Sequence, residues 1–219
     1  MLNRRHFFQA SASTAAVVIL GAAPVRLARA QATSGTPGQI LGPFYPMVRT
    51  MNETGDLTRV PGRTGRAEGQ ILNVSGTVLN GRGEPVRGAK LEVWQANALG
   101  RYAHPSDRNP APLDPNFEGF GVVTTDDQGR YRFLTIKPAA YPVIGTDMIR
   151  PAHIHFDIMG RYDRIVTQMY FEGDPYNERD RFLQSVGRPE RLIAKSVPAQ
   201  ADAEPGSQAV VFNLVLPTG

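Results

Sequence analysis

Short stretches of alternating apolar and polar residues, separated by turn-forming clusters, fill most of the chain after residue 69. The alternation in residues 70–79 has the period of two that is typical of a strand with one buried face. The turn sequence Asp-Asp-Gln-Gly at 126–129 predicts a hairpin between strands at 121–125 and 130–136. Further strands are expected at residues 89–96, 152–159, 165–171 and 209–216.

These elements predict an all-β fold, an antiparallel β-sandwich with a prealbumin-like core. Short strands, hairpin turns, 22 glycines and 18 prolines favour it, and helical periodicity is confined to residues 178–186. Residues 31–69 are rich in Gly, Pro and Thr and predict an irregular arm across the sandwich, whereas residues 70–219 predict the sandwich domain itself. A chain of this size is long enough for one sizeable core.

The first 30 residues have the features of an export signal. Arg4 and Arg5 precede His6-Phe7-Phe8, which resembles a twin-arginine signal, although Asn3 departs from the usual pattern. The apolar stretch 10–23 is too short and too rich in Ala and Ser for a membrane span, and Ala-Arg-Ala at 28–30 predicts cleavage after Ala30. We therefore expect export to the periplasm or the medium, without stable membrane insertion after cleavage. A general secretory signal and an uncleaved amphipathic tail are the alternatives.

Charge and cysteine content narrow the function classes. The chain has 24 Lys and Arg against 20 Asp and Glu, and four arginines of the leader account for the whole excess. The rest of the chain has no basic run with interleaved aromatic residues, so we expect no nucleic-acid partner. The absence of cysteine excludes disulfides, thiolate metal sites and cysteine nucleophiles.

Four residues suggest a metal centre. His153 and His155 are spaced i, i+2 in a strand-like stretch, so both imidazoles project from the same face. Tyr102 and Tyr141 are candidate partners, because a phenol that titrates near pH ~10 ligates well when a strongly Lewis-acidic cation such as Fe(III) replaces its proton. We interpret the set as a non-haem Fe(III) site with about one iron per chain. Taken singly, the histidine pair is equally compatible with a structural role, and a tyrosine is more often an ordinary core residue.

Several stretches follow one another in an order known from one enzyme family. They are residues 93–102 (VWQANALGRY), 113–117 (LDPNF), 135–138 (TIKP), 141–142 (YP), 150–155 (RPAHIH) and 167–175 (TQMYFEGDP). Together they resemble the intradiol ring-cleaving dioxygenases, and within them the protocatechuate branch. The resemblance covers roughly residues 40–176.

The resemblance implies a ligand set. Tyr102 and His153 would be equatorial ligands of Fe(III), and Tyr141 and His155 axial ligands, with a hydroxide in the fifth position. Two phenolates and one hydroxide balance the three charges of the ferric ion, which favours that oxidation state.

The resemblance also implies the reaction. A small aromatic diol would replace the hydroxide and the Tyr141 phenolate, and O2 would cleave its ring to a cis,cis-muconate-type diacid. Arg150 would stabilise the negative charge that develops, and Gln168 would support the site by hydrogen bonding. Protocatechuate is the favoured substrate; catechol, hydroxyquinol and lignin-derived catechols stay open, because Val143 replaces a family tryptophan and the N-terminal segment is short.

Three alternatives to this interpretation stay open at this point. A three-histidine zinc hydrolase would recruit His104 to the histidine pair, and a two-histidine, one-carboxylate Fe(II) site would recruit Asp157. A metal-free, prealbumin-like binding module of an exported protein would need only the hairpin-rich stretch 76–133.

Gly42-Pro43 resembles a turn that borders the cavity in the family, which suggests a homo-oligomer in which an arm borders its own or a neighbour's site.

Overall fold

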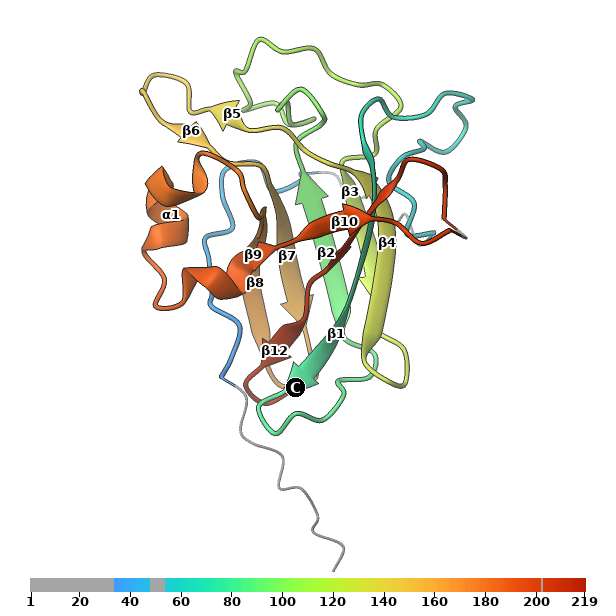
Figure 1. Cartoon of the computed structure of the whole chain (residues 1–219), viewed down its shortest axis with the longest axis vertical. Coiled ribbons are helices and arrows are strands. Elements are labelled where there is room, and N and C mark those ends of the chain that lie inside the picture. The colour runs from blue at the N-terminus through green and yellow to red at the C-terminus, as the bar shows by residue number, and fades with distance from the viewer. Residues whose placement is uncertain (1–33, 48–53, 202) are drawn as a thin grey trace, which may run out of the picture.

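The computed structural model describes residues 34–47, 54–201 and 203–219. Two β-sheets lie face to face, with a short helix on one flank (Figure 1). The strands are β1 (Ile71–Asn80), β2 (Lys90–Gln95), β3 (Phe120–Thr124), β4 (Arg130–Ile136), β5 (Tyr141–Pro142), β6 (Ile149–Arg150), β7 (His153–Met159), β8 (Arg164–Phe171), β9 (Ile193–Ala194), β10 (Ser196–Pro198), β11 (Gln208–Val211) and β12 (Leu214–Leu216). The helical segments are the α-helix α1 (Arg181–Gln184) and the 3-10 turns η1 (Asn177–Arg179) and η2 (Pro189–Leu192).

The two sheets have different strand orders. One runs β10-β11-β1-β12 with β4 also paired to β1, and the other runs β3-β2-β7-β8-β9. A separate hairpin joins β5 and β6. The expected all-β sandwich is confirmed, although β1 pairs in parallel with β11 and β12 and the first sheet is therefore mixed. The expected export signal lies outside the described residues, and among the described residues no helix is long and apolar enough to span a membrane.

The hairpin predicted across residues 121–136 was wrong. The turn itself forms, since Asp126 N donates to Arg130 O at 2.9 Å and Gly129 N donates to Asp126 O at 2.9 Å. However, β3 pairs with β2 and β4 pairs with β1, so the turn carries the chain from one sheet to the other. Alternation shows that a strand has an apolar face. It does not show whether the strand after the turn pairs with the one before it or belongs to the opposite sheet.

Two other expectations needed correction. The helix expected at 178–186 is reduced to η1 and the four-residue α1. The last strand, expected at 209–216, is interrupted at Phe212 and Asn213, and its two parts, β11 and β12, keep the same register against β1. A Cβ at Gly76 of β1 would lie 2.0 Å from the carbonyl oxygen of Phe212, so only glycine fits there. This close backbone approach explains the glycine beside the interruption, a constraint that hydrophobic patterning does not record.

The main core lies between the two sheets. β1 alternates buried and half-buried residues along most of its length, as expected for a strand with one face inside. Its buried side chains join one apolar cluster with those of β2 and β7: Leu72, Val74, Val78, Leu91, Val93, Ile154, Phe156 and Ile158.

The sheet that contains β7 is also covered on its outer face. Residues 34–47 contain no helix or strand and run along this face: Gln39 N donates to Val166 O at 2.8 Å, and Thr167 Oγ1 donates to Pro37 O at 2.8 Å. Leu41 and Phe44 pack against a second apolar cluster there. The arm therefore forms a third layer, beneath which polar side chains of β7 are buried.

Candidate metal centre and active site

Tyr102, His153 and His155 bring three metal-binding atoms together. His153 Nε2 lies 3.2 Å from His155 Nε2 and 3.4 Å from the Tyr102 hydroxyl, and His155 Nε2 lies 3.2 Å from that hydroxyl. All three residues are at most 2% exposed. The three atoms form a nearly equilateral triangle. Its centre lies about 1.9 Å from each atom, close to the ~2.0–2.1 Å of metal–imidazole bonds. The geometry and the donor types fit a metal cation.

Strand geometry explains the position of the two histidines. They are successive outward residues of β7, alternating with the core residues Ile154 and Phe156. The 2.7 Å contact between His153 Nδ1 and Pro151 O requires the proton on Nδ1, so the Nε2 lone pair points into the site. His155 stacks on Trp94, with ring centroids 4.7 Å apart and an interplanar angle of 8°.

Burial and the nearby positive charge of Arg150 hold the pKa of both His153 and His155 well below the usual range. The imidazoles are therefore neutral at neutral pH, as metal ligands must be. Burial, followed by the neighbouring Tyr141, raises the pKa of Tyr102 well above its ordinary value. The site thus favours uncharged side chains, and a phenolate forms there when a cation compensates it.

The fourth predicted ligand lies beside this triangle. Tyr141 opens β5, and its ring centroid lies 5.4 Å from that of Tyr102 and 5.6 Å from that of His153. Burial raises its pKa, an effect that the charge of Arg150 opposes. Tyr141 and Arg150 are register partners in the β5–β6 hairpin, which places this phenol next to the predicted substrate-facing cation.

A tight turn after β2 positions Tyr102. Asn97 Oδ1 accepts hydrogen bonds from Leu99 N and Arg101 N, each at 2.9 Å, and Asp107 Oδ2 accepts one from Tyr102 N at 2.7 Å. Side-chain acceptors of this kind fix a loop without regular structure. This loop and the β5–β6 hairpin lie at the same end of the sandwich (Figure 1).

Arg150 and Gln168, the two predicted supporting residues, are in direct contact. Arg150 Nη2 donates to Gln168 Oε1 at 2.7 Å, and Gln168 Nε2 donates to the carbonyl oxygen of Ile40 in the arm at 3.0 Å. Burial works against the charge of Arg150, but Tyr170, Tyr141 and Asp180 keep its pKa raised. Arg150 is therefore a permanent cation beside the four predicted ligands.

The arm covers the site of its own chain. A Cβ at Gly42, whose φ is +79°, would lie 3.2 Å from His155 Cε1. The ring of Phe44 lies 4.7 Å from that of Tyr102. Tyr45 packs on Trp94 and donates a short hydrogen bond to the buried carboxylate of Glu92. Within the described chain, the Gly42 turn thus borders this chain's own histidines.

The alternative metal sites are not formed. Among the residues that the structure describes, no three His, Asp or Glu side chains converge as a metal site, so His104 does not complete a three-histidine site. His104 instead accepts a hydrogen bond from Ser106 N at 3.1 Å in an exposed loop. Asp157 points from the same face of β7 as His155, but its two oxygens accept hydrogen bonds from Nε and Nη2 of Arg164, at 2.7 and 2.6 Å.

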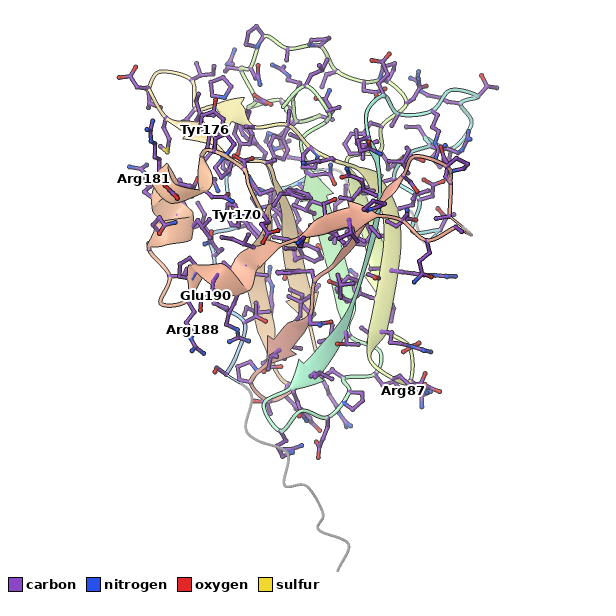
Figure 2. The ribbon with its side chains drawn as sticks, in the orientation of Figure 1. Arg87, Tyr170, Tyr176, Arg181, Arg188 and Glu190 are labelled. Atoms are coloured by element: carbon purple, nitrogen blue, oxygen red, sulfur yellow. The ribbon has the colours of Figure 1, made fainter. Side chains whose placement is uncertain are left out.

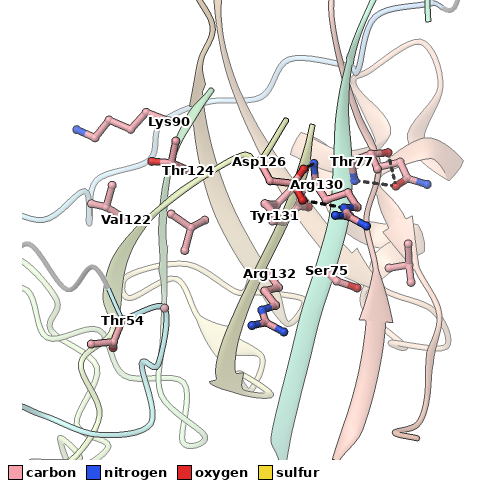
Figure 3. Close-up of a pocket in the computed structure, with 15 residues that line it drawn as sticks. Thr54, Ser75, Thr77, Lys90, Val122, Thr124, Asp126, Arg130, Tyr131 and Arg132 are labelled. Carbon is pink, nitrogen blue, oxygen red and sulfur yellow. Dashed lines mark hydrogen bonds and ion pairs between the residues drawn. The ribbon is translucent and has the colours of Figure 1, made fainter. Parts of the chain in front are cut away.

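A groove of about 1240 Å³ lies elsewhere, along β3 and β4 (Figure 3). None of the predicted site residues lines it. Two of its cations are already paired, Arg130 with Asp126 at 2.8 Å and Lys90 with Glu92 at 2.7 Å. The groove is therefore separate from the candidate metal centre.

Comparison with known proteins agrees with this geometry. The family model described as Dioxygenase (Dioxygenase_C) matches residues 40–218. The chain is 51% identical over 147 residues to the protocatechuate 3,4-dioxygenase beta chain of Burkholderia cepacia, an alignment that covers 64% of this chain and 62% of the relative. The chain belongs to the intradiol ring-cleavage dioxygenase family.

Two further relatives in the dioxygenase family are less similar to this chain. Hydroxyquinol 1,2-dioxygenase of Rhizobium sp. (strain MTP-10005) is 31% identical over 168 residues, which cover 71% of this chain and 53% of that relative. The solved hydroxyquinol 1,2-dioxygenase of Pseudomonas putida DLL-E4 superposes with a TM-score of 0.69 at 25% identity, covering 86% of this chain and 68% of that one. The chain spans between about half and 62% of the length of the curated relatives named here.

Several residues that build the site of this dioxygenase-family chain were not predicted from the sequence. Trp94 and Tyr170 lie inside stretches that carry the resemblance, which was the available signal for them. Phe44 follows the Gly42-Pro43 turn, but nothing in the pattern placed its ring on Tyr102. Asp180, fully buried beside Arg150, lay inside the stretch 178–186 that was expected to be helical, and nothing in the pattern marked it as a site residue.

Proposed function

We propose that this chain is a non-haem Fe(III)-dependent intradiol dioxygenase that cleaves a catechol-type ring with O2 to a cis,cis-muconate-type diacid. The observation that carries the proposal is the buried convergence of Tyr102 Oη, His153 Nε2 and His155 Nε2 within 3.2–3.4 Å, with Tyr141 alongside. Family membership over residues 40–218 supports it.

Each residue of this site has a distinct proposed task. Tyr102, Tyr141, His153 and His155 would hold the iron, and the bound Fe(III) would supply the Lewis acidity that activates a catecholate toward O2. Tyr141, next to Arg150 in the β5–β6 hairpin, would leave as a phenol by taking up a catechol proton. The high pKa that burial gives Tyr141 favours this proton uptake.

Two further features would assist the reaction. Arg150 places a fixed cation where negative charge grows on the substrate, which lowers the barrier more than it stabilises the ground state. Gln168 holds the Arg150 guanidinium at 2.7 Å. Gly42 and Phe44 of the arm pack on His155 and Tyr102 and would keep bulk water from these ligands.

We propose protocatechuate or a close analogue as the substrate. The 51% identity to a protocatechuate 3,4-dioxygenase beta chain favours it over hydroxyquinol, the substrate named for a relative at 31% identity.

The first test is a visible spectrum of the purified protein together with iron analysis and oxygen uptake. Tyrosinate ligation to Fe(III) predicts a red protein with about one iron per chain, a band that shifts when a catechol is added, and uptake of O2 with protocatechuate faster than with catechol or hydroxyquinol. A colourless protein that does not take up iron would refute the proposal. Uptake with catechol alone would refute only the substrate.

We also propose export by a twin-arginine-type signal at residues 1–30 and assembly into a homo-oligomer. The Arg4-Arg5 pair and the Ala-Arg-Ala sequence at 28–30 support export. This route carries folded proteins, so iron could be inserted before export. Mass spectrometry of the N-terminus of secreted protein tests cleavage after Ala30. Light scattering tests assembly, and a fully active monomer would exclude a site shared between chains.

A further inference from the structure

Asp180 is a fully buried carboxylate whose two oxygens perform different tasks. Oδ1 accepts a hydrogen bond from Leu183 N at 2.7 Å and so caps α1. Oδ2 accepts one from Arg150 Nε at 2.6 Å. An N-cap requires an oxygen acceptor but no charge, because Ser and Asn cap as well as Asp does. The cap alone therefore leaves the buried charge of Asp180 unexplained, whereas its pairing with Arg150 explains it.

The Arg150 guanidinium is held on two of its three nitrogens. Besides the Nε contact, Nη2 donates to Gln168 Oε1 at 2.7 Å and to the Tyr170 hydroxyl at 3.1 Å. The ring of Phe182 lies 4.6 Å from Cζ. Among the described residues, Nη1 has no hydrogen-bond partner. Because the guanidinium is planar, fixing Nε and Nη2 also fixes the direction of the two Nη1 protons.

The holding residues come from three separate parts of the chain. Gln168 and Tyr170 are on β8, Asp180 precedes α1, and Tyr170 also donates to Gln39 Oε1 of the arm at 3.1 Å. Figure 2 shows Tyr170 in the interior, next to the helical segment from which Arg181 projects outward. The short helix thus holds one side of a cation whose other contacts come from the sheet.

We propose that Asp180 is a positioning residue: through Arg150, it fixes the one free guanidinium nitrogen toward the substrate bound at the Tyr102–His155 site. This inference rests on the proposed dioxygenase function. Arg150 is the register partner of Tyr141 in the β5–β6 pair, which sets the arginine beside the phenol that a bound diol would replace. Without the Asp180 carboxylate, the buried Arg150 would lose its counter-charge and the hydrogen bond of its Nε. Its side chain would then reorient toward other acceptors.

The test combines Asp180→Asn, Arg150→Gln and the double variant, each loaded with iron. Asparagine keeps an oxygen for the Leu183 cap and removes the charge. Two readouts are measured: the dissociation constant of catechol under anaerobic conditions, from the visible spectrum, and kcat/KM from oxygen uptake with protocatechuate. Asp157→Asn is the control, because it removes the charge of another buried aspartate that is paired with an arginine, the more exposed Arg164, and that does not contact Arg150.

We expect Asp180→Asn to lower kcat/KM at least tenfold and to weaken anaerobic catechol binding, while Asp157→Asn leaves both near the wild-type values. The double variant should match Arg150→Gln within about twofold, since a residue that acts through Arg150 has no effect once Arg150 is gone. A wild-type Kd and kcat/KM in Asp180→Asn, or an undiminished loss on the Arg150→Gln background, would overturn the proposal.

Two precautions keep the result interpretable. If Asp180→Asn does not fold, Asp180→Ser replaces it in the same comparison, because serine retains a capping oxygen. The wild-type protein is measured first. A wild type that neither binds iron nor takes up oxygen refutes the proposed function, whereas an active wild type with an unaffected Asp180→Asn variant refutes only the role of Asp180.

Discussion

Iron binding should depend steeply on pH, because the site holds its tyrosines protonated and its histidines neutral. Burial raises the pKa of Tyr102 and Tyr141, and burial with Arg150 lowers the pKa of His153 and His155. At neutral pH each ligating tyrosine must therefore lose one proton when Fe(III) binds, and the histidines lose none. Each proton released adds a factor of about ten in affinity per pH unit, or about 1.4 kcal/mol.

The magnitude follows from counting these protons. The two tyrosines together contribute a slope of about two in a plot of log affinity against pH, and the expected hydroxide ligand adds about one more. The tyrosines alone should raise the affinity about 10⁴-fold, or about 5.5 kcal/mol, between pH 6 and pH 8. The assay is competition with a chelator of known protonation constants, corrected for hydrolysis of the free ferric ion.

Single variants separate the contributions to this slope. Tyr102→Phe and Tyr141→Phe should each reduce the slope by about one. Tyr131→Phe is the control, because Tyr131 is also buried with a raised pKa but donates to Phe212 O at 2.5 Å, away from the site. An unchanged slope in both site variants would refute phenolate ligation.

Three further perturbations test the layers around the site. Gly42→Ala forces a left-handed φ of +79° on alanine and places a Cβ 3.2 Å from His155; we expect a loss of about 1–2 kcal/mol and a shifted visible band, and an unchanged spectrum would contradict the contact. Phe156→Ala empties part of the main core and should cost about 3–5 kcal/mol in urea unfolding, whereas a loss below about 1 kcal/mol would show a core that collapses around the gap. Tyr45→Phe removes the hydrogen bond to buried Glu92 and should cost about 1.5–3 kcal/mol, and a loss within about 0.5 kcal/mol would mean that this bond does not anchor the arm.

Residue patterning predicted the strands well and their pairing poorly. The expected strands at 70–79, 89–96 and 130–136 lie within one residue of β1, β2 and β4, because a period of two follows directly from burying one face. The same pattern is compatible with a hairpin and with a turn that crosses between sheets. The choice depends on partners that are distant in sequence, since β4 pairs with β1 and β3 pairs with β2.

In the candidate site, too, local spacing predicted some features, whereas contacts between distant segments could not be predicted. His153 and His155 share a strand, so their spacing alone places both rings on one face. Tyr102 and Tyr141 come from loop and hairpin positions, so phenol chemistry and the family resemblance could make them candidates, but their spacing could not place them beside the histidines. Asp180 was missed because a buried carboxylate before a short helix looks like an ordinary cap until its second oxygen is seen on Arg150.

The N-terminal arm both buries the candidate metal ligands and helps to hold Arg150. In a two-layer sandwich the outer face of β7 would be exposed to water, and burial would not shift the pKa values of His153, His155 and Tyr102. The arm adds a third layer through Gly42 and Phe44, and the same segment accepts a hydrogen bond from Gln168, which holds Arg150. Desolvation of the ligands and orientation of the cation therefore depend on one irregular segment, so loosening the arm should change metal affinity and Arg150 together.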